Sequence, residues 1–244
     1  MGVTTTWLDR WDAQQETYLP EREERFEVIV DLLEATAGPR PRVLDLACGP
    51  ASLALRVLAR LPEASVVGVD TDPVLLALAR AAAPASLELV DADLRRPDWP
   101  DRIPAGPYDA VLSTTALHWL EPDALRCVYA ACARLLRPGG LLANGDHLHD
   151  LESPKLDKLA RELDRRRTER YAGDGEDWSG WWDAIRADPE LSQAVAERDQ
   201  LQFEHPEKTE TNLAVHERAL RDAGFDEVAV LWRKGTNAVL VALR

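Results

Sequence analysis

The chain has 244 residues, of which 45% are hydrophobic, and a formal net charge of −14. Its length allows one large domain, or a core with a lid. The acidic charge disfavours nucleic-acid binding, and no apolar run approaches the ~20 residues of a membrane helix. The polar N-terminus lacks a secretion-signal pattern, and the three scattered cysteines match no disulfide framework or zinc site, so we expect a cytoplasmic protein.

The N-terminal region predicts a helix over 20–37, because Pro20 suits a first helical turn and Gly38 is typical of a helix end. Strands and helices then alternate. Strands are expected at 42–46, 65–70, 86–90, 108–113 and 141–146, and helices at 51–61, 72–83 and 121–136. This alternation predicts a parallel sheet with right-handed crossovers.

Residues 151–206 interrupt the alternation, because they are charged and mostly helical. A final helix is expected at about 207–222. Two strands at 225–232 and 237–244 follow, and the connection between them is too short for a parallel crossover, so they should pair antiparallel.

These elements predict an α/β fold: a Rossmann-like, doubly wound, mostly parallel seven-stranded sheet with a C-terminal antiparallel hairpin and a helical lid insertion. We expect four segments. They are an N-terminal helical cap (1–38), a ligand-binding core (39–150), a lid or substrate insertion (151–206) and a C-terminal helix and hairpin that complete the core (207–244).

The run RVLDLACGPASLA at 42–54 is the most informative stretch. A strand ends in Asp45, a tight turn of small residues surrounds Gly49, and a helix begins. Small residues in such a turn let a nucleotide-like ligand approach the main chain. The next strand ends in Asp70, where an acid can accept hydrogen bonds from a ribose, while Asp72 is better placed to cap the following helix. The dinucleotide pattern G-x-G-x-x-G and the P-loop pattern are both absent.

An acid closing each of the first two strands, with the pattern D-x-x-x-G-x-x after the first, resembles the class I methyltransferases that use S-adenosylmethionine. The terminal antiparallel hairpin resembles the same fold. The ALHW stretch at 116–119 and the LRPGG turn at 136–140 look like the trans-aconitate methyltransferase-like branch of small-molecule methyltransferases. Ala47 and Ala51 depart from the family, which more often has glycine there.

The resemblance implies S-adenosylmethionine as the cofactor. It places Asp45 near the amino group of the cofactor and the amides around Ala47 and Gly49 beside it. It also places Asp70 on the ribose hydroxyls, with Thr71 lining the adenine or ribose.

Further cofactor contacts follow from the same resemblance. Asp93 and Leu94 align with the acid-plus-apolar pair that meets the adenine, with Asp91 as a competing register. Thr114, at the end of the fourth strand, is expected to line the cofactor.

The N-terminal segment is expected to fold over the cofactor, as in related enzymes. Tyr18 would cover it and Arg25 would meet its carboxylate, with Arg22 competing for that role.

Three histidines follow the fourth and fifth strands, and the carboxyl ends of parallel strands face one crevice. His118 or His147 is the candidate general base, while His149 and Trp119 are candidate substrate contacts. Convergence of these imidazoles on a metal is the alternative, but their spacing does not favour it, so no metal is expected.

Trp178, Trp181 and Trp182 share one helix face. That face either packs a lid on the main domain or presents an aromatic wall to an apolar or aromatic substrate, and both are compatible. We assign Trp178 and Trp182 to substrate binding.

The expected function is S-adenosylmethionine-dependent methyl transfer to a small-molecule acceptor, by O- or N-methylation, with natural-product biosynthesis as a possible setting. The enzyme would be a monomer or homodimer without nucleic-acid or membrane partners. Two alternatives remain: a non-catalytic cofactor-binding regulatory subunit, and the same fold using S-adenosylmethionine for chemistry other than methylation.

Overall fold

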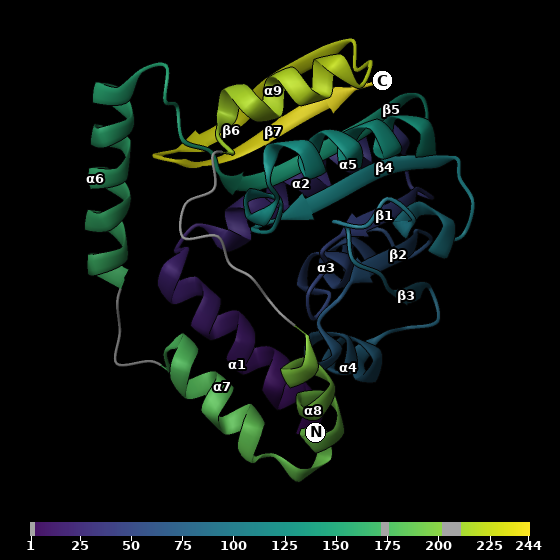
Figure 1. The fold of residues 1–244 in the computed structure, drawn as a ribbon, viewed down its shortest axis with the longest axis vertical. Coiled ribbons are helices and arrows are strands. Elements are labelled where there is room, and N and C mark those ends of the chain that lie inside the picture. Colours follow the sequence, from purple (N-terminus) through teal and green to yellow (C-terminus); the bar gives the residue numbers. More distant parts are fainter. Residues whose placement is uncertain (1–2, 172–175, 202–210) are drawn as a thin grey trace.

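The computed structural model describes residues 3–171, 176–201 and 211–244. A seven-stranded sheet with the order β3-β2-β1-β4-β5-β7-β6 forms its centre (Figure 1). The strands are β1 Arg42–Leu46, β2 Ser65–Asp70, β3 Leu87–Asp91, β4 Tyr108–Thr114, β5 Leu136–His147, β6 Glu227–Lys234 and β7 Asn237–Leu243. Strands β1 to β5 are parallel, whereas β7 pairs antiparallel with both β5 and β6. The predicted fold class is confirmed, including its terminal hairpin.

Helices cover both faces of the sheet. They are α1 Val3–Tyr18, α2 Arg22–Ala37, α3 Ser52–Arg60, α4 Pro73–Ala82, α5 Pro122–Leu135, α6 Pro154–Tyr171, α7 Trp178–Ala187, α8 Ser192–Gln200 and α9 Leu213–Asp222. Helices α2, α3 and α4 pack on one face, and α5 and α9 pack on the other. The central strands are therefore buried on both sides, which explains why β1 is apolar apart from Arg42 at its start and Asp45.

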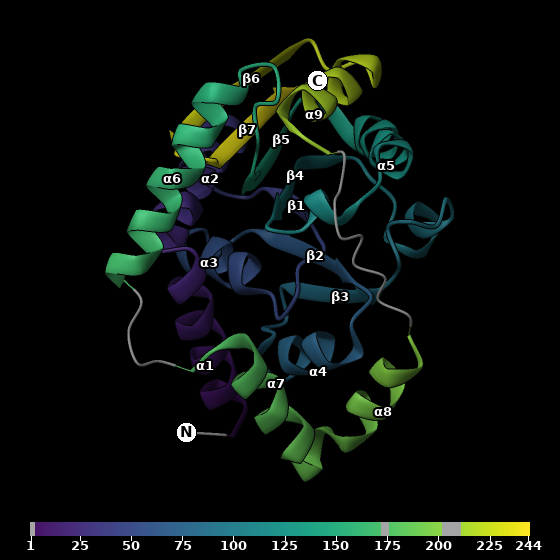
Figure 2. The ribbon, with the colours of Figure 1, turned by 60° about the vertical axis from the view of Figure 1, so that its left-hand side comes forward.

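Helix α1 is an element that the sequence analysis did not predict. It lies with α7 and α8 at one end of the molecule, near α4 (Figures 1 and 2). Trp7 and Trp11 of α1 pack there against Trp181 and Ile185 of α7 and against Leu78 of α4. This group of helices covers the carboxyl ends of the neighbouring strands.

The segments expected as a cap and a lid are each divided in space. In the N-terminal segment, α2 belongs to the helix layer of the sheet, and α1 alone lies with α7 and α8. In the inserted segment, α6 stands apart from α7 and α8, beside the end of the β6–β7 hairpin (Figure 2). There Asp164 accepts a hydrogen bond from the Thr236 amide at 2.9 Å.

Two predicted boundaries differ from the structure by more than two residues. Strand β5 begins at Leu136 and not at 141, because the turn backbone pairs with the end of the chain: the Arg244 amide donates to the Gly140 carbonyl at 3.1 Å. The last helix begins at Leu213, after the capping residue Asn212. The expected start at 207 lies outside the described residues. None of the described helices is both long enough and apolar enough to cross a membrane.

The hairpin offers a test of the packing. Leu240 of β7 is fully buried, whereas Leu231 of β6 is 58% exposed. We expect Leu240→Ala to lower the free energy of unfolding by about 2–5 kcal/mol, since it leaves a cavity, and Leu231→Ala to change it by less than about 0.5 kcal/mol. Urea denaturation measures both, and equal losses would contradict this packing.

Candidate cofactor and acceptor site

A cavity of about 580 Å³ lies at the carboxyl ends of β1, β2 and β4. Thirteen of the sequence-predicted site residues line it: Tyr18, Asp45, Ala47, Gly49, Asp70, Thr71, Asp93, Leu94, Thr114, His118, Trp119, Trp178 and Trp182. Arg22, the competing candidate for the cofactor carboxylate, also lines the cavity, whereas Asp91, the competing register, does not. The parallel strands thus bring residues from the whole chain to one place.

The turn after β1 has a backbone that favours glycine. Ala47, Gly49 and Ala51 have φ angles of 50°, 55° and 67°, in the left-handed region. A Cβ is unfavourable there, which gives a physical reason for the glycines that the family more often has. Alanine is the smallest side chain that can replace them, so the turn keeps its shape.

Asp70 is held rigidly at the end of β2. Its Oδ2 accepts a hydrogen bond from the Gly49 amide at 2.7 Å, and its Oδ1 accepts from the Thr71 and Asp72 amides at 2.7 and 2.9 Å. Burial raises the pKa of Asp70 to about 6, although these amides oppose the shift. Asp72 caps α4 as predicted. Because a carboxylate oxygen can accept more than one hydrogen bond, Asp70 keeps capacity for ribose hydroxyls.

Asp45 lines the cavity but is only 2% exposed, and its Oδ2 has no hydrogen-bond partner among the described residues. Burial, and then the charge of Asp70, raise the pKa of Asp45 to about 8. A buried carboxyl oxygen without a partner is costly unless a ligand satisfies it. The ammonium group of S-adenosylmethionine is a partner of suitable charge, so the residues present fit that cofactor.

His118 and Asp146 form a pair at the cavity wall. His118 Nδ1 lies 2.7 Å from Asp146 Oδ1, and the His118 amide donates to Oδ2 at 3.2 Å. Burial lowers the pKa of His118, but Asp146 outweighs it, so the net pKa lies above the usual value. His118 Nε2 makes no hydrogen bond with the described residues. The imidazole is therefore held by a carboxylate, with one nitrogen remaining for a ligand.

The neighbours of Asp146 determine the charge of its carboxyl group. Asp146 is fully buried, which by itself would raise its pKa, yet His118 and then Arg25 hold the pKa well below the usual range. Asp146 thus stays ionised and keeps the proton of the neutral imidazole on Nδ1. Among the site residues, Asp146 is the partner that sequence reasoning missed. Its position at the carboxyl end of β5, the strand next to the one that leads to His118, was the available signal.

The structure does not bring His147, His149 or Arg25 to the cavity, which corrects the sequence interpretation. His147 Nδ1 lies 2.9 Å from Thr236 Oγ1, and His149 Nδ1 lies 3.1 Å from Asp157. Strand β5 alternates its side chains, so His147 points away from Asp146. No group of three or more potential metal ligands occurs in the described part of the chain.

Arg25 was the expected partner of the cofactor carboxylate, but its guanidinium is completely buried. It donates to Asn237 Oδ1 at 3.1 Å and also to Thr115. It packs so closely on Gly145 that a Cβ there would lie 2.8 Å from Arg25 Cδ. Arg25 therefore lies outside the cavity, where its positive charge helps to keep Asp146 ionised.

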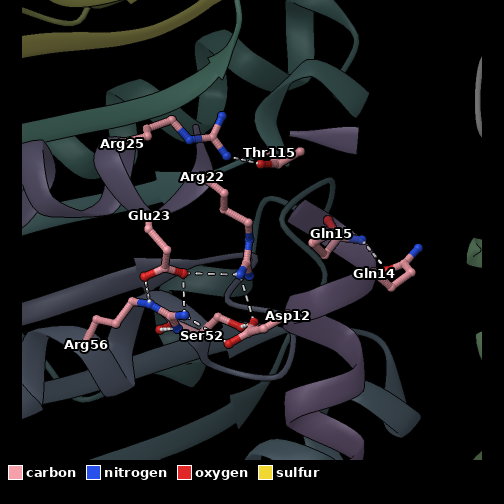
Figure 3. A network of polar contacts seen from close by, with 9 residues as sticks. All are labelled: Asp12, Gln14, Gln15, Arg22, Glu23, Arg25, Ser52, Arg56 and Thr115. Carbon is pink, nitrogen blue, oxygen red and sulfur yellow. Dashed lines mark hydrogen bonds and ion pairs between the residues drawn. The ribbon is translucent and has the colours of Figure 1, made fainter. Parts of the chain in front are cut away.

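Helix α1 is anchored over the cavity by the polar network in Figure 3. Asp12 accepts from Arg22 at 2.8 Å, from Ser52 at 2.7 Å and from Arg56 at 3.0 Å, and Arg56 also donates to Glu23 at 2.7 Å. Burial raises the pKa of Asp12, but the two arginines outweigh it and hold the pKa below its usual range. The network joins α1 to α2 and α3, and so fixes Trp11, Gln15 and Tyr18 at the cavity.

Known proteins give an independent view of this site. Residues 43–140 match a family described as a methyltransferase domain. The chain is 37% identical over 137 residues to a trans-aconitate 2-methyltransferase of Azoarcus sp. (strain BH72), covering 56% of this chain and 50% of that protein. It is 34% identical over 150 residues to a release factor glutamine methyltransferase of Gloeobacter violaceus, covering 51% of each. The chain spans about half the length of the curated relatives it matches.

Among solved structures, the fold is similar to that of an amino pentose methyltransferase from Micromonospora echinaspora. The TM-score is 0.57 and the identity 18%, over 91% of this chain and 90% of that one. The fold, with its terminal antiparallel hairpin, is that of the class I methyltransferases. Residues 43–140 match the methyltransferase domain family, so the family resemblance is confirmed.

The His118–Asp146 pair makes a prediction about titration. Because Asp146 favours the charged imidazole, we expect NMR to show a His118 pKa above 6.5, and a pKa below 6.5 in Asp146→Asn, where only burial and Arg25 act. Burial lowers the pKa of His216 to about 4, and the charge of Asp146 opposes this shift, so the pKa of His216 should also fall in Asp146→Asn. An unchanged His118 pKa in Asp146→Asn would contradict the pairing.

Proposed function

We propose that this protein binds S-adenosylmethionine in the cavity and transfers its methyl group to a small-molecule acceptor. The observation that supports the proposal most directly is that one cavity joins Asp45 and Asp70, at the ends of adjacent strands, to the His118–Asp146 pair. When bound, the cofactor supplies a methyl group already activated by its sulfonium. The protein then has to bind the acceptor and orient it toward this methyl group, exclude water from the cavity, and accept the proton that the acceptor loses.

The cofactor contacts of the proposal come from the strand ends and the turn after β1. Asp70 receives the ribose and Asp45 the ammonium group, while Asp93 and Leu94 border the adenine. The remaining contacts are the small turn residues Ala47 and Gly49, together with Tyr18, Thr71 and Thr114. We assign the cofactor carboxylate to Arg22, because Arg22 lines the cavity and Arg25 does not.

In the proposed mechanism, His118 is the general base. Its Nε2 accepts the proton of an acceptor hydroxyl or amine, and Asp146 holds the tautomer and stabilises the resulting imidazolium. The pair favours catalysis over a non-catalytic cofactor-binding role, because a binding subunit has no use for an oriented base. Cofactor-assisted chemistry other than methylation would leave S-adenosylmethionine intact after turnover, so product analysis distinguishes it.

Most of the relatives that the chain matches support a small-molecule acceptor. Several are named trans-aconitate 2-methyltransferase, and the amino pentose methyltransferase is described as involved in calicheamicin biosynthesis. We extend this setting, the biosynthesis of natural products, to the present protein. We further propose that it works in the cytoplasm as a monomer or homodimer, and the net charge of −14 disfavours nucleic-acid partners.

Calorimetric titration with S-adenosylhomocysteine tests cofactor binding. We expect Asp70→Ala to weaken binding roughly tenfold or more, because hydrogen bonds to a charged acceptor are lost. Asp226→Ala, which removes an exposed acid outside the cavity, should bind as the unchanged protein does. Circular dichroism confirms that each variant folds. No binding heat with the unchanged protein would refute the proposal.

The general base is tested by His118→Ala. We expect kcat to fall about a hundredfold or more while S-adenosylhomocysteine still binds normally. In the unchanged enzyme the rate should rise with pH, because the base works when deprotonated, and its raised pKa places the acidic limb above pH 6.5. A normal kcat in His118→Ala would remove His118 from the chemistry.

A further inference from the structure

The acceptor part of the cavity indicates a substrate class. Building on the proposed methyl transfer, we propose that the acceptor is a planar, largely apolar molecule with an ionisable hydroxyl, a phenol or an enol, and not a polycarboxylate. Three separate features of the cavity support this assignment: its aromatic surfaces, the pairing of its arginines and the oriented base.

Two aromatic side chains outside the proposed cofactor contacts line the cavity yet keep a large exposed surface: Trp119 is 45% exposed and Trp178 43%. Their positions are fixed by neighbours. The Trp178 ring lies 5.6 Å from that of Trp11 and 5.7 Å from that of Trp182, and the Trp178 amide donates to the Tyr18 hydroxyl at 3.1 Å. Rigid flat surfaces that remain open within a cavity favour a flat apolar ligand.

The charges of the cavity disfavour a polyanion. Its described lining contains the arginines Arg22, Arg95 and Arg198, and each already faces a carboxylate. Arg22 is paired with Asp12 at 2.8 Å, Arg95 with Asp93 at 2.8 Å and Arg198 with Asp72 at 2.7 Å. A guanidinium that binds one carboxylate in this way has less to offer a polyanionic acceptor, and the remaining nitrogens of Arg22 are already assigned to the carboxylate of the cofactor.

Arg198 shows how the arginines are occupied. Its guanidinium lies 3.9 Å from the ring centroid of Trp182 and donates through Nε to Asp72, the capping residue of α4. Its role is to join α8 to α4 and to pack over the face of the Trp182 ring. The same lining also contains the ionised carboxylates of Asp70 and Asp93, so added anionic charge meets repulsion there.

The His118–Asp146 pair further restricts the class of acceptor. A carboxylate acceptor is already ionised near neutral pH and needs no base, whereas a phenol or enol must lose a proton. In the proposed step, the hydroxyl oxygen forms a bond to the methyl carbon and the carbon–sulfur bond breaks. Its electron pair stays on sulfur, giving S-adenosylhomocysteine, and the hydroxyl proton goes to Nε2 of His118. Atoms and charges balance without a further reactant.

The test compares acceptors of matched shape. Methyl transfer from S-adenosylmethionine is followed by S-adenosylhomocysteine release with a panel of one- to three-ring phenols including 2-naphthol, with naphthalene-2-carboxylate, and with trans-aconitate, a tricarboxylate. We expect turnover with phenols, at least tenfold slower turnover with the naphthoate, and none with trans-aconitate. Turnover of trans-aconitate faster than of every phenol would overturn the substrate class while leaving the methyltransferase function intact.

A binding measurement separates the two proposals. With S-adenosylhomocysteine bound, 2-naphthol should quench the tryptophan fluorescence, and the quenching should saturate as its concentration rises. Trans-aconitate should cause no quenching. Trp178→Leu should raise the KM or Kd for 2-naphthol about tenfold, with S-adenosylhomocysteine affinity changed less than twofold. Trp232→Leu, on β6 outside the cavity, should leave both unchanged. Neither turnover nor quenching with any phenol, in a protein that binds S-adenosylhomocysteine, would also overturn the proposal.

Discussion

The structure depends on the parallel pairing of β1 with β2 and β4. In this register Leu46 lies opposite Val69 on one side and Ser113 on the other, so three strands end together. Parallel strands that end together place their following turns at one edge, and this edge holds the cavity. The acids that close β1 and β2 and the loop that carries His118 meet there because the backbone pairing fixes the register of the three strands.

A second constraint acts through Asp146. This buried carboxylate accepts hydrogen bonds from the His118 amide and the His147 amide, so it ties the loop after β4 to β5. Arg25 approaches from α2 over Gly145, where no side chain is in the way. His118 and Arg25 stabilise the negative charge of the buried Asp146. Asp146 in turn orients the imidazole of His118, so that its Nε2 can accept a proton. Structural and chemical roles coincide in the same few residues.

The helical elements show where local sequence patterns stop being informative. Helix α4 was predictable, since Asp72 and Pro73 give a cap and a first turn that need no tertiary context. Helix α1 was not, because its apolar residues are few among polar ones and gain their meaning only by packing against α7 and α4. Its anchoring through Asp12 depends on arginines from two other helices.

The sequence by itself determined the alternating strands, the terminal hairpin, the family and the residues at the strand ends, because periodicity and turn chemistry are local. Only the tertiary structure decided which charged side chains reach the cavity. Arg22 enters it while Arg25, three residues further along the same helix, is buried on the sheet. His118 finds Asp146 while His147 turns away from the cavity. These outcomes follow from helix rotation and strand alternation relative to distant neighbours, which no local pattern contains.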